Sequence, residues 1–135
     1  MIDHMGISPA DIERARQFYD AALKPLGIAN VMEVMPEQTG GYHGIGYGTG
    51  RKPFFWLSSD SRRAPPGGPR GAGLHIAFEA ESRAAVDAFY AAAMAQGGRD
   101  NGGPGIRPHY HSAYYAAFVI DPDEVNVEAV CQKPE

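Results

Sequence analysis

The sequence has a single cysteine, no long apolar run and no cluster of basic residues. A lone cysteine excludes an internal disulfide, which fits a reducing compartment, and Cys131 in its apolar run is best interpreted as a small buried hydrophobe. The net charge of -4 argues against a nucleic-acid-binding surface. No stretch approaches the roughly 18 apolar residues of a membrane span, and no leader-like segment opens the chain. We expect a cytoplasmic protein that binds neither nucleic acid nor membrane.

The chain of 135 residues, 44% of them hydrophobic, is long enough for one compact domain. Its main positive signal is an internal repeat at a constant offset of 71 residues, from His4 to His75. The residues that recur in the first copy are His4, Phe18, Tyr19, Ala22 and Gly27, matched by His75, Phe89, Tyr90, Ala93 and Gly98. Each copy predicts a short strand with one histidine, followed by an amphipathic helix.

The first copy predicts a strand, a helix and three further strands. Ser8 is the expected helix cap, with Pro9 at the first helical position. Apolar residues at three- and four-residue spacing then favour a helix to about Lys24. Alternation and turn residues predict the strands Ile2–Ile7, Ile28–Met35, Tyr42–Tyr47 and Phe54–Leu57.

The second copy follows a linker from Ser58 to Gly73 that is rich in proline, glycine and arginine. Ser82 is expected to cap a helix that runs to about Gln96. The strands expected around it are Leu74–Phe78, Tyr114–Ile120 and Val125–Cys131, the last two joined by a turn over 121–124. We therefore expect a single domain over 1–135, built from modules at about 1–58 and 74–135.

Glu128 is an acidic residue among apolar neighbours in its strand, where burial is costly unless a cation or hydrogen-bond donors satisfy the carboxylate. With His4 and His75 on equivalent strands, it makes a set of three possible metal ligands. Three protein ligands leave a position open for water or substrate, as in catalytic metal sites. Imidazole and carboxylate suit Fe, Mn, Ni, Co or Zn, and the residues do not select among these divalent metals.

The sequence resembles the vicinal oxygen chelate superfamily, which includes glyoxalases, bleomycin resistance proteins and extradiol dioxygenases. The resemblance covers nearly the whole chain. It rests on four segments: Asp3-His4-Met5-Gly6-Ile7 with the Phe18-Tyr19 helix, Leu74-His75-Ile76-Ala77-Phe78, Phe118-Val119-Ile120-Asp121-Pro122-Asp123 and Asn126-Val127-Glu128. It implies an α+β fold in which two βαβββ modules form an incomplete eight-stranded barrel around a metal-binding cup, with His4, His75 and Glu128 as metal ligands.

Two positions depart from the pattern of the family. Glyoxalase I-like members carry a fourth ligand on the last strand of the first module, where this chain has Trp56 or, without a one-residue gap, Leu57. Neither side chain binds metal, so a glyoxalase I reaction with four protein ligands is not expected. Glu124 stands where the turn of the family usually has glycine, at a position that favours a left-handed residue.

The remaining candidates surround the expected cup. His109, Tyr110 and His111 are candidate catalytic residues that handle protons, with a solvent-exposed aromatic loop as the alternative. Aromatic residues in or near strands are candidate substrate contacts, although packing alone favours aromatics there. These are Tyr42, Tyr47, Trp56, Tyr114 and Tyr115. The glycines at 44, 46, 48 and 50 precede no helix, so they do not indicate a nucleotide-binding loop.

Two functions remain open from the sequence. The first is a metal-dependent lyase, isomerase or dioxygenase that acts on a small substrate with adjacent oxygens, the metal serving as a Lewis acid. The alternative is a metal-free ligand-binding protein of the bleomycin-resistance kind, because the fold alone does not fix the function. Relatives of this kind often pair as homodimers, sometimes completing each barrel with a module of the partner, and we expect a homodimer here.

Overall fold

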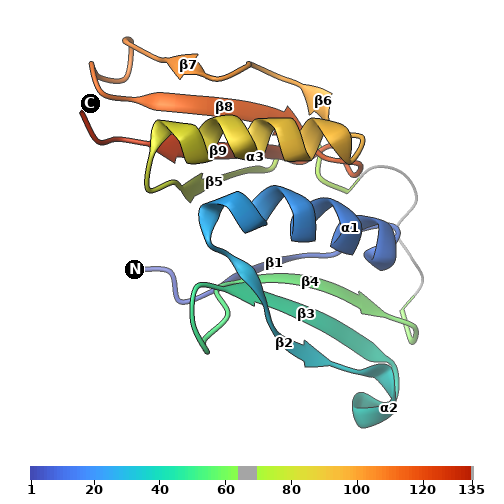
Figure 1. Ribbon diagram of the computed structural model, residues 1–135. Helices are drawn as coiled ribbons and strands as arrows, with labels where there is room; N and C mark the ends of the chain where they lie inside the picture. The colour runs from blue at the N-terminus through green and yellow to red at the C-terminus, as the bar shows by residue number, and fades with distance from the viewer. Residues whose placement is uncertain (64–69, 135) are drawn as a thin grey trace.

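The structure is a computed structural model, described here for residues 1–63 and 70–134. Its elements fall into two modules (Figure 1). The elements of the first are β1 (Met5–Ile7), α1 (Ile12–Leu23), the 3-10 turn η1 (Lys24–Leu26), β2 (Ala29–Val34), α2 (Pro36–Thr39), β3 (Tyr42–Gly48) and β4 (Phe55–Asp60). Those of the second are β5 (His75–Glu79), α3 (Arg83–Ala95), β6 (Arg99–Asp100), β7 (Gly105–Ile106), β8 (Tyr115–Ile120) and β9 (Asn126–Cys131).

The two modules have the same strand order, as the repeat predicts. The first sheet is ordered β1-β4-β3-β2 and the second β5-β9-β8-β6, with β7 also paired to β8. In the first sheet β1 lies at the edge and pairs in parallel with β4. In the second sheet β5 lies at the edge and pairs in parallel with β9. The expected α+β class is confirmed; within one chain the strands form two separate sheets.

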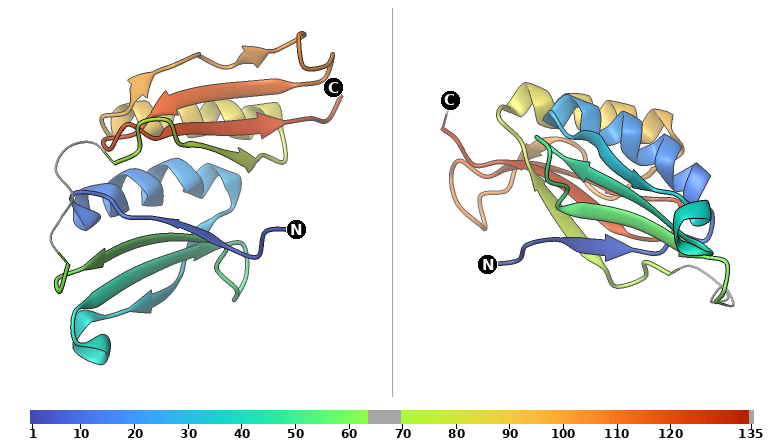
Figure 2. Two further views of the ribbon diagram at one scale, coloured as in Figure 1. Left: turned by 180° about the vertical axis from the view of Figure 1, so that it is seen from behind. Right: turned by 90° about the horizontal axis from the view of Figure 1, so that it is seen from below.

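The helices lie together between the sheets and the solvent on one side of the molecule (Figures 1 and 2). Helix α1 packs against α3. The core is formed by their inner faces and by the strands behind them, with Phe18, Val86 and Phe89 fully buried. The sheet faces opposite the helices remain available for a site.

A buried hydrogen bond joins the modules. The Tyr19 hydroxyl, on α1, donates to Asp121 Oδ2 at 2.7 Å, in the turn after β8. The other carboxylate oxygen of Asp121 accepts the backbone N–H groups of Asp123 and Val125. Burial raises the pKa of Asp121 above its usual range and that of Tyr19 well above 10.

Several boundaries differ from expectation for local reasons. Asp11 rather than Ser8 caps α1, because its carboxylate accepts the N–H of Arg14, while Ser8 Oγ lies 3.1 Å from Ser58 Oγ. Ser82 caps α3 as predicted. Strand β4 continues through Asp60, so the linker begins later than expected, and its residues 64–69 lie outside the described part.

Two features of the turns and helices bear on later predictions. Glu124 adopts φ 70°, and among the described residues it is the only non-glycine with a positive φ. No helix in the ranges 1–63 and 70–134 is long and apolar enough to cross a membrane.

Candidate metal centre

His75 and Glu128 form a close pair on the second sheet. Ala77 of β5 lies opposite Glu128 of β9 in parallel register, and His75 lies two residues earlier on the same face. His75 Nε2 is 2.8 Å from Glu128 Oε2. The Glu128 side chain is 2% exposed, whereas the His75 side chain is 50% exposed. A buried carboxylate therefore meets an imidazole that solvent or a ligand can reach.

Tyr114 holds the second oxygen of the carboxylate. Its hydroxyl donates to Glu128 Oε1 at 2.6 Å. Burial, and then this contact with Glu128, raises the pKa of Tyr114 to about 12, so the phenol stays a proton donor at neutral pH. Tyr114, expected as a substrate contact, thus positions Glu128.

The donor set of this pair fits a divalent cation but is incomplete in one chain. An imidazole nitrogen and a carboxylate oxygen from neighbouring strands are ligands that such cations accept. Among the described residues, however, no group of three or more His, Cys, Asp or Glu side chains that could hold a metal is present. A third protein ligand must come from elsewhere if the site is to follow the predicted set.

His4 lies apart from the pair. It precedes β1 at the edge of the first sheet, and its Nδ1 is 2.7 Å from Asp3 Oδ1. The contacts with His4 and Lys52 lower the pKa of Asp3. His4 lines a cavity with β5 residues from Ile76 to Glu79, but within residues 1–63 and 70–134 it forms no metal-binding group with His75 and Glu128. One chain does not bring the two histidines together.

The open face of the first sheet carries a row of glycines that makes room for aromatic rings. A Cβ on Gly44 would lie 2.8 Å from the Tyr42 ring, and one on Gly46 would lie 2.9 Å from the Trp56 ring. Both rings line a cavity of about 540 Å³ that also includes His4 and Met32. Tyr42 and Trp56 therefore lie on one accessible face together with the first predicted ligand.

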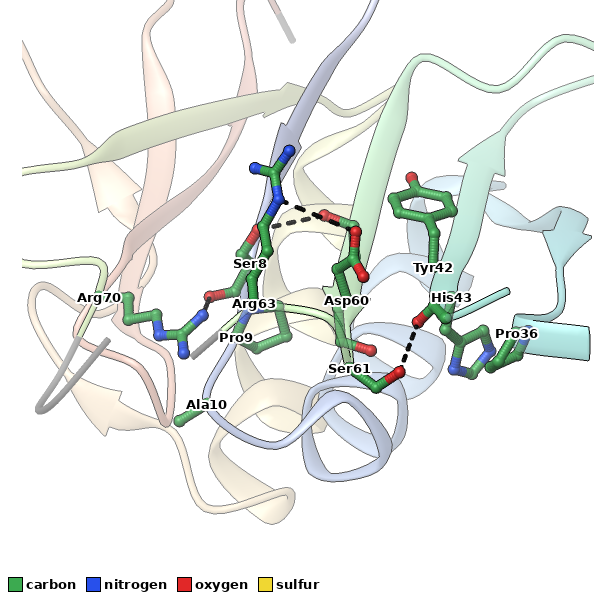
Figure 3. Close-up of a pocket in the computed structure, with 13 residues that line it drawn as sticks. Ser8, Pro9, Ala10, Pro36, Tyr42, His43, Asp60, Ser61, Arg63 and Arg70 are labelled. Carbon is green, nitrogen blue, oxygen red and sulfur yellow. Dashed lines mark hydrogen bonds and ion pairs between the residues drawn. The ribbon is translucent and has the colours of Figure 1, made fainter. Parts of the chain in front are cut away.

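Tyr42 also borders a larger cavity of about 650 Å³, whose lining includes several charged side chains (Figure 3). Asp60 and Arg63, from the end of β4 and just beyond it, form one wall, where Arg63 Nε is 3.9 Å from the Asp60 carboxylate. On the other side Arg70 Nη1 donates to Ser8 O at 3.0 Å. Hydrogen bonds from Arg62 lower the pKa of Asp60 to about 2. None of the three predicted metal ligands lines this cavity.

Two of the predicted substrate contacts face the helices. Tyr47 is fully buried, and its hydroxyl donates to Asp20 Oδ1 at 2.8 Å. Tyr115 donates to Asp87 on α3, and Arg83 lies over its ring at 5.2 Å. Strand alternation explains the outcome, because Tyr115 points opposite to Tyr114. These two residues belong to the packing between sheet and helices.

The candidate catalytic loop lies beside Tyr114. The ring of Tyr110 is 4.7 Å from that of Tyr114 and 4.3 Å from that of His109. His111 Nδ1 accepts the N–H of Ala113, and its Nε2 lies 3.0 Å from Gln132 Oε1. All three loop residues are exposed, and the side chains that hydrogen-bond to the Glu128 carboxylate are those of His75 and Tyr114.

The sequence reasoning missed Phe118 and Arg107. Phe118 is the cross-strand partner of Glu128, and its ring centre is 6.1 Å from that of His75. The Arg107 guanidinium lies over the same ring, 5.4 Å from its centre. The register of the predicted hairpin around 121–124 pairs Phe118 with Glu128, so it could have revealed Phe118. Nothing in the sequence pattern marks Arg107.

A second polar cluster lies on the helix side of the first sheet. His43 Nε2 is 2.8 Å from Glu33 Oε1, and Arg16 contacts the same carboxylate. Hydrogen bonds from Arg16 and His43 lower the pKa of Glu33 to about 2. These contacts tie α1 to β2 and β3, and His43 also lines the 650 Å³ cavity.

The comparisons with known proteins agree with this architecture. The family model described as the Glyoxalase/Bleomycin resistance protein/Dioxygenase superfamily matches residues 1–129. A glyoxalase/bleomycin resistance protein from Albidiferax ferrireducens T118 is 28% identical, with 96% of this chain and 97% of that chain covered and a TM-score of 0.70. A putative glyoxalase from Bacillus halodurans is 24% identical, with 97% and 95% covered and a TM-score of 0.64.

A larger protein shares the fold. Glyoxalase I from Zea mays is 19% identical, with a TM-score of 0.72 over 99% of this chain and 45% of that chain. No curated protein matches the sequence. The structural likeness therefore extends across the whole described chain, including the strands that carry His75 and Glu128.

Proposed function

Because the chain belongs to the Glyoxalase/Bleomycin resistance protein/Dioxygenase superfamily, we propose that it is a metal-dependent enzyme for a small substrate with adjacent oxygens. The reaction is of the lyase, isomerase or dioxygenase type. We propose a cytoplasmic location as well, which the single buried cysteine supports.

The His75–Glu128 pair is the observation that carries this proposal. Glu128 is almost fully buried, and a buried carboxylate is retained at a cost unless it is paired or coordinates a metal. It meets His75 at 2.8 Å, on a face that stays open to a ligand. Tyr114 orients the carboxylate, as hydrogen-bonded partners of metal ligands commonly do.

We propose that a homodimer completes the ligand set. Within one chain His4 is remote from the pair, yet β1 and β5 both form open sheet edges. If the β1 edge of one chain meets the β5 edge of another, His4 of the partner subunit can join His75 and Glu128. Two equivalent sites then form in a symmetric dimer.

The residues have distinct proposed roles. His4, His75 and Glu128 hold a divalent metal, one of Fe, Mn, Ni, Co or Zn, which when bound supplies a Lewis acid for a developing oxyanion. His109, Tyr110 or His111 donates or accepts the proton, because these side chains are accessible beside Tyr114. Tyr42 and Trp56 contact the substrate from the first sheet.

One observation favours the alternative, a metal-free ligand-binding protein. Both histidines already have protein partners, since His4 contacts Asp3 and His75 contacts Glu128. An engaged histidine is expected if the site holds a ligand by packing alone. The alternative predicts that ligand affinity is unchanged by a chelator.

Metal content tests the main proposal. We expect wild-type protein, purified without chelator, to bind close to one divalent metal per chain, and H75A and E128Q to lose at least about tenfold in affinity. The matched control is E81Q, which removes an exposed carboxylate paired with Lys133. Full metal content in both H75A and E128Q would rule out this site.

Mixing variants tests whether the site is shared between chains. H4A and E128Q each destroy both sites of a homodimer, but a mixed dimer keeps one intact site. Refolding or exchanging the two variants together should therefore restore about a quarter of the wild-type metal content for random pairing, in which half of the dimers are mixed. No recovery would show that the three ligands do not come from two chains.

A further inference from the structure

We propose that Arg107 recognises an anionic group of the substrate, a carboxylate or phosphate at the end remote from its adjacent oxygens. This inference rests on the proposed function, because it places the oxygens at the His75–Glu128 pair. The natural substrate is then an anion with a flat middle portion between its adjacent oxygens and its charged end.

The backbone around Arg107 is shaped to hold its guanidinium. Gly102 adopts φ +135°, and a Cβ there would lie 3.3 Å from Arg107 Nη2. A Cβ on Gly105 would lie 3.0 Å from Nη1. The guanidinium carbon also lies 5.4 Å from the centre of the Phe118 ring, and a Cβ on Gly102 would lie 3.3 Å from that ring as well. The guanidinium therefore lies against glycine backbone and an aromatic ring.

The charge of Arg107 is not neutralised by a carboxylate. Nη2 donates to Gly103 O at 2.7 Å, and Nη1 makes a long contact of 3.5 Å with Ile106 O. Within residues 1–63 and 70–134 no Asp or Glu pairs with this side chain. A guanidinium has five N–H donors, so several remain for a ligand. By contrast, Arg99 is neutralised by Glu124, to which it donates two hydrogen bonds of 2.8 and 3.1 Å.

Arg107 faces a cavity that adjoins the candidate metal ligands. The cavity, of about 280 Å³, is lined by Arg107, His109, Phe118 and Asn126 among others. Asn126 lies opposite His75 in the β5–β9 register, and it accepts a hydrogen bond from Asn101 at 3.1 Å. The Phe118 ring lies next to both Arg107 and His75. One aromatic ring thus contacts both the cation and the imidazole of the His75–Glu128 pair.

This spacing determines the kind of molecule that fits. A substrate whose adjacent oxygens bind a metal held by His75 and Glu128 would extend across Phe118, where a flat group packs well. Its far end would reach Arg107, whose planar fork binds carboxylate or phosphate through two parallel hydrogen bonds. A neutral substrate would leave this cation without a partner.

Matched probes test the inference on zinc-loaded wild-type protein. Catechol has two adjacent oxygens, 3,4-dihydroxybenzoate adds a carboxylate, and 3,4-dihydroxyphenylphosphonate adds a phosphonate. We expect calorimetry to give at least about tenfold tighter binding of one or both anionic probes than of catechol. The tighter of the two identifies the favoured anion. Equal affinity for all three probes would overturn the inference.

Variants assign the preference to Arg107. R107Q should reduce the affinity ratio of anionic probe to catechol to near one, and R107K should keep part of it, because it retains the charge without the fork. R99Q is the matched control and should keep the wild-type ratio. Circular dichroism establishes that each variant is folded, and an unchanged ratio in R107Q would refute the role of Arg107.

The result is separable from the proposed function. Catechol affinity with and without zinc reports on the metal centre, whereas the ratio between probes reports on Arg107. If zinc leaves catechol affinity unchanged, the metal-dependent function fails, and the ratio in R107Q still decides whether Arg107 binds the anion.

Discussion

Trp56 occupies in the first module the position that Glu128 occupies in the second. Gly6 lies opposite Trp56, and Ala77, the repeat equivalent of Gly6, lies opposite Glu128. The one-residue gap in the repeat is therefore the correct alignment, and it leaves one module with a carboxylate and the other with an indole. The two halves share a backbone but have different ligand chemistry.

This relationship predicts a gain of metal affinity. W56E introduces a fourth candidate ligand on the strand next to His4, so we expect at least about tenfold tighter zinc binding in the dimer. Calorimetry measures the affinity, and W56Q controls for loss of the ring. Equal affinities in W56E, W56Q and wild type would argue against a centre that uses the first sheet.

Tyr114 should matter for metal binding without being a ligand. Y114F removes the hydroxyl that donates to Glu128 Oε1 and frees the carboxylate to turn. Loss of such a partner typically costs 10- to 100-fold in metal affinity, and we expect about tenfold here. Y90F, which removes an exposed hydroxyl that donates to Asp100, should bind metal like wild type. A wild-type affinity in Y114F would contradict the positioning role.

Glu33 should make stability depend on pH. Its pKa is about 2 in the folded protein against an ordinary value of 4.5, so its contribution is full above pH 4.5 and disappears as the pH falls toward 2. We expect E33Q to lower the free energy of unfolding by about 1 kcal/mol at pH 7, and the difference from wild type to vanish near pH 2.

Denaturant titrations at pH 7, 4.5 and 2.5 measure this difference. The control is E13Q, because Glu13 also contacts Arg16 but is 62% exposed. A pH-independent difference between E33Q and wild type would show that the effect comes from packing rather than from charge.

Glu124 should tolerate replacement by glycine. E124G relieves a left-handed conformation that costs a side chain on the order of 1 kcal/mol, and it also loses an exposed ion pair with Arg99. We expect a small net stabilisation in thermal unfolding and unchanged zinc affinity. E124Q keeps the strain but loses the charge, so it should be slightly less stable than wild type. Reduced metal binding in E124G would implicate Glu124 in the site.

The sequence predicted the architecture because the repeat involves the residues that pack. His75 and Glu128 could be paired from alternation and strand order, since they lie on regular, neighbouring strands, β5 at the sheet edge and β9 next to it. The separation of His4 from them depends on how α1 packs against α3, and no local pattern encodes that arrangement. The cap at Asp11 rather than Ser8 was missed because both are good capping residues, and contact of Ser8 with Ser58 decided between them.

The aromatic candidates illustrate the same limit. Tyr114 and Tyr115 are adjacent, and the sequence alone left open which of them faces the helices. Their hydroxyls, bonded to Glu128 and Asp87 respectively, establish the answer. Arg107 lies outside regular strands in a glycine-rich loop, where periodicity carries no information about direction.

The row of glycines beneath Tyr42 and Trp56 has an optical consequence. Trp56 is the only tryptophan of the chain, and its indole lies over Gly46 on an accessible sheet face. Emission excited at long ultraviolet wavelength therefore arises from one known location. The protein has a built-in fluorophore on that face, and quenching or a shift of its spectrum would signal the arrival of an occupant without any label.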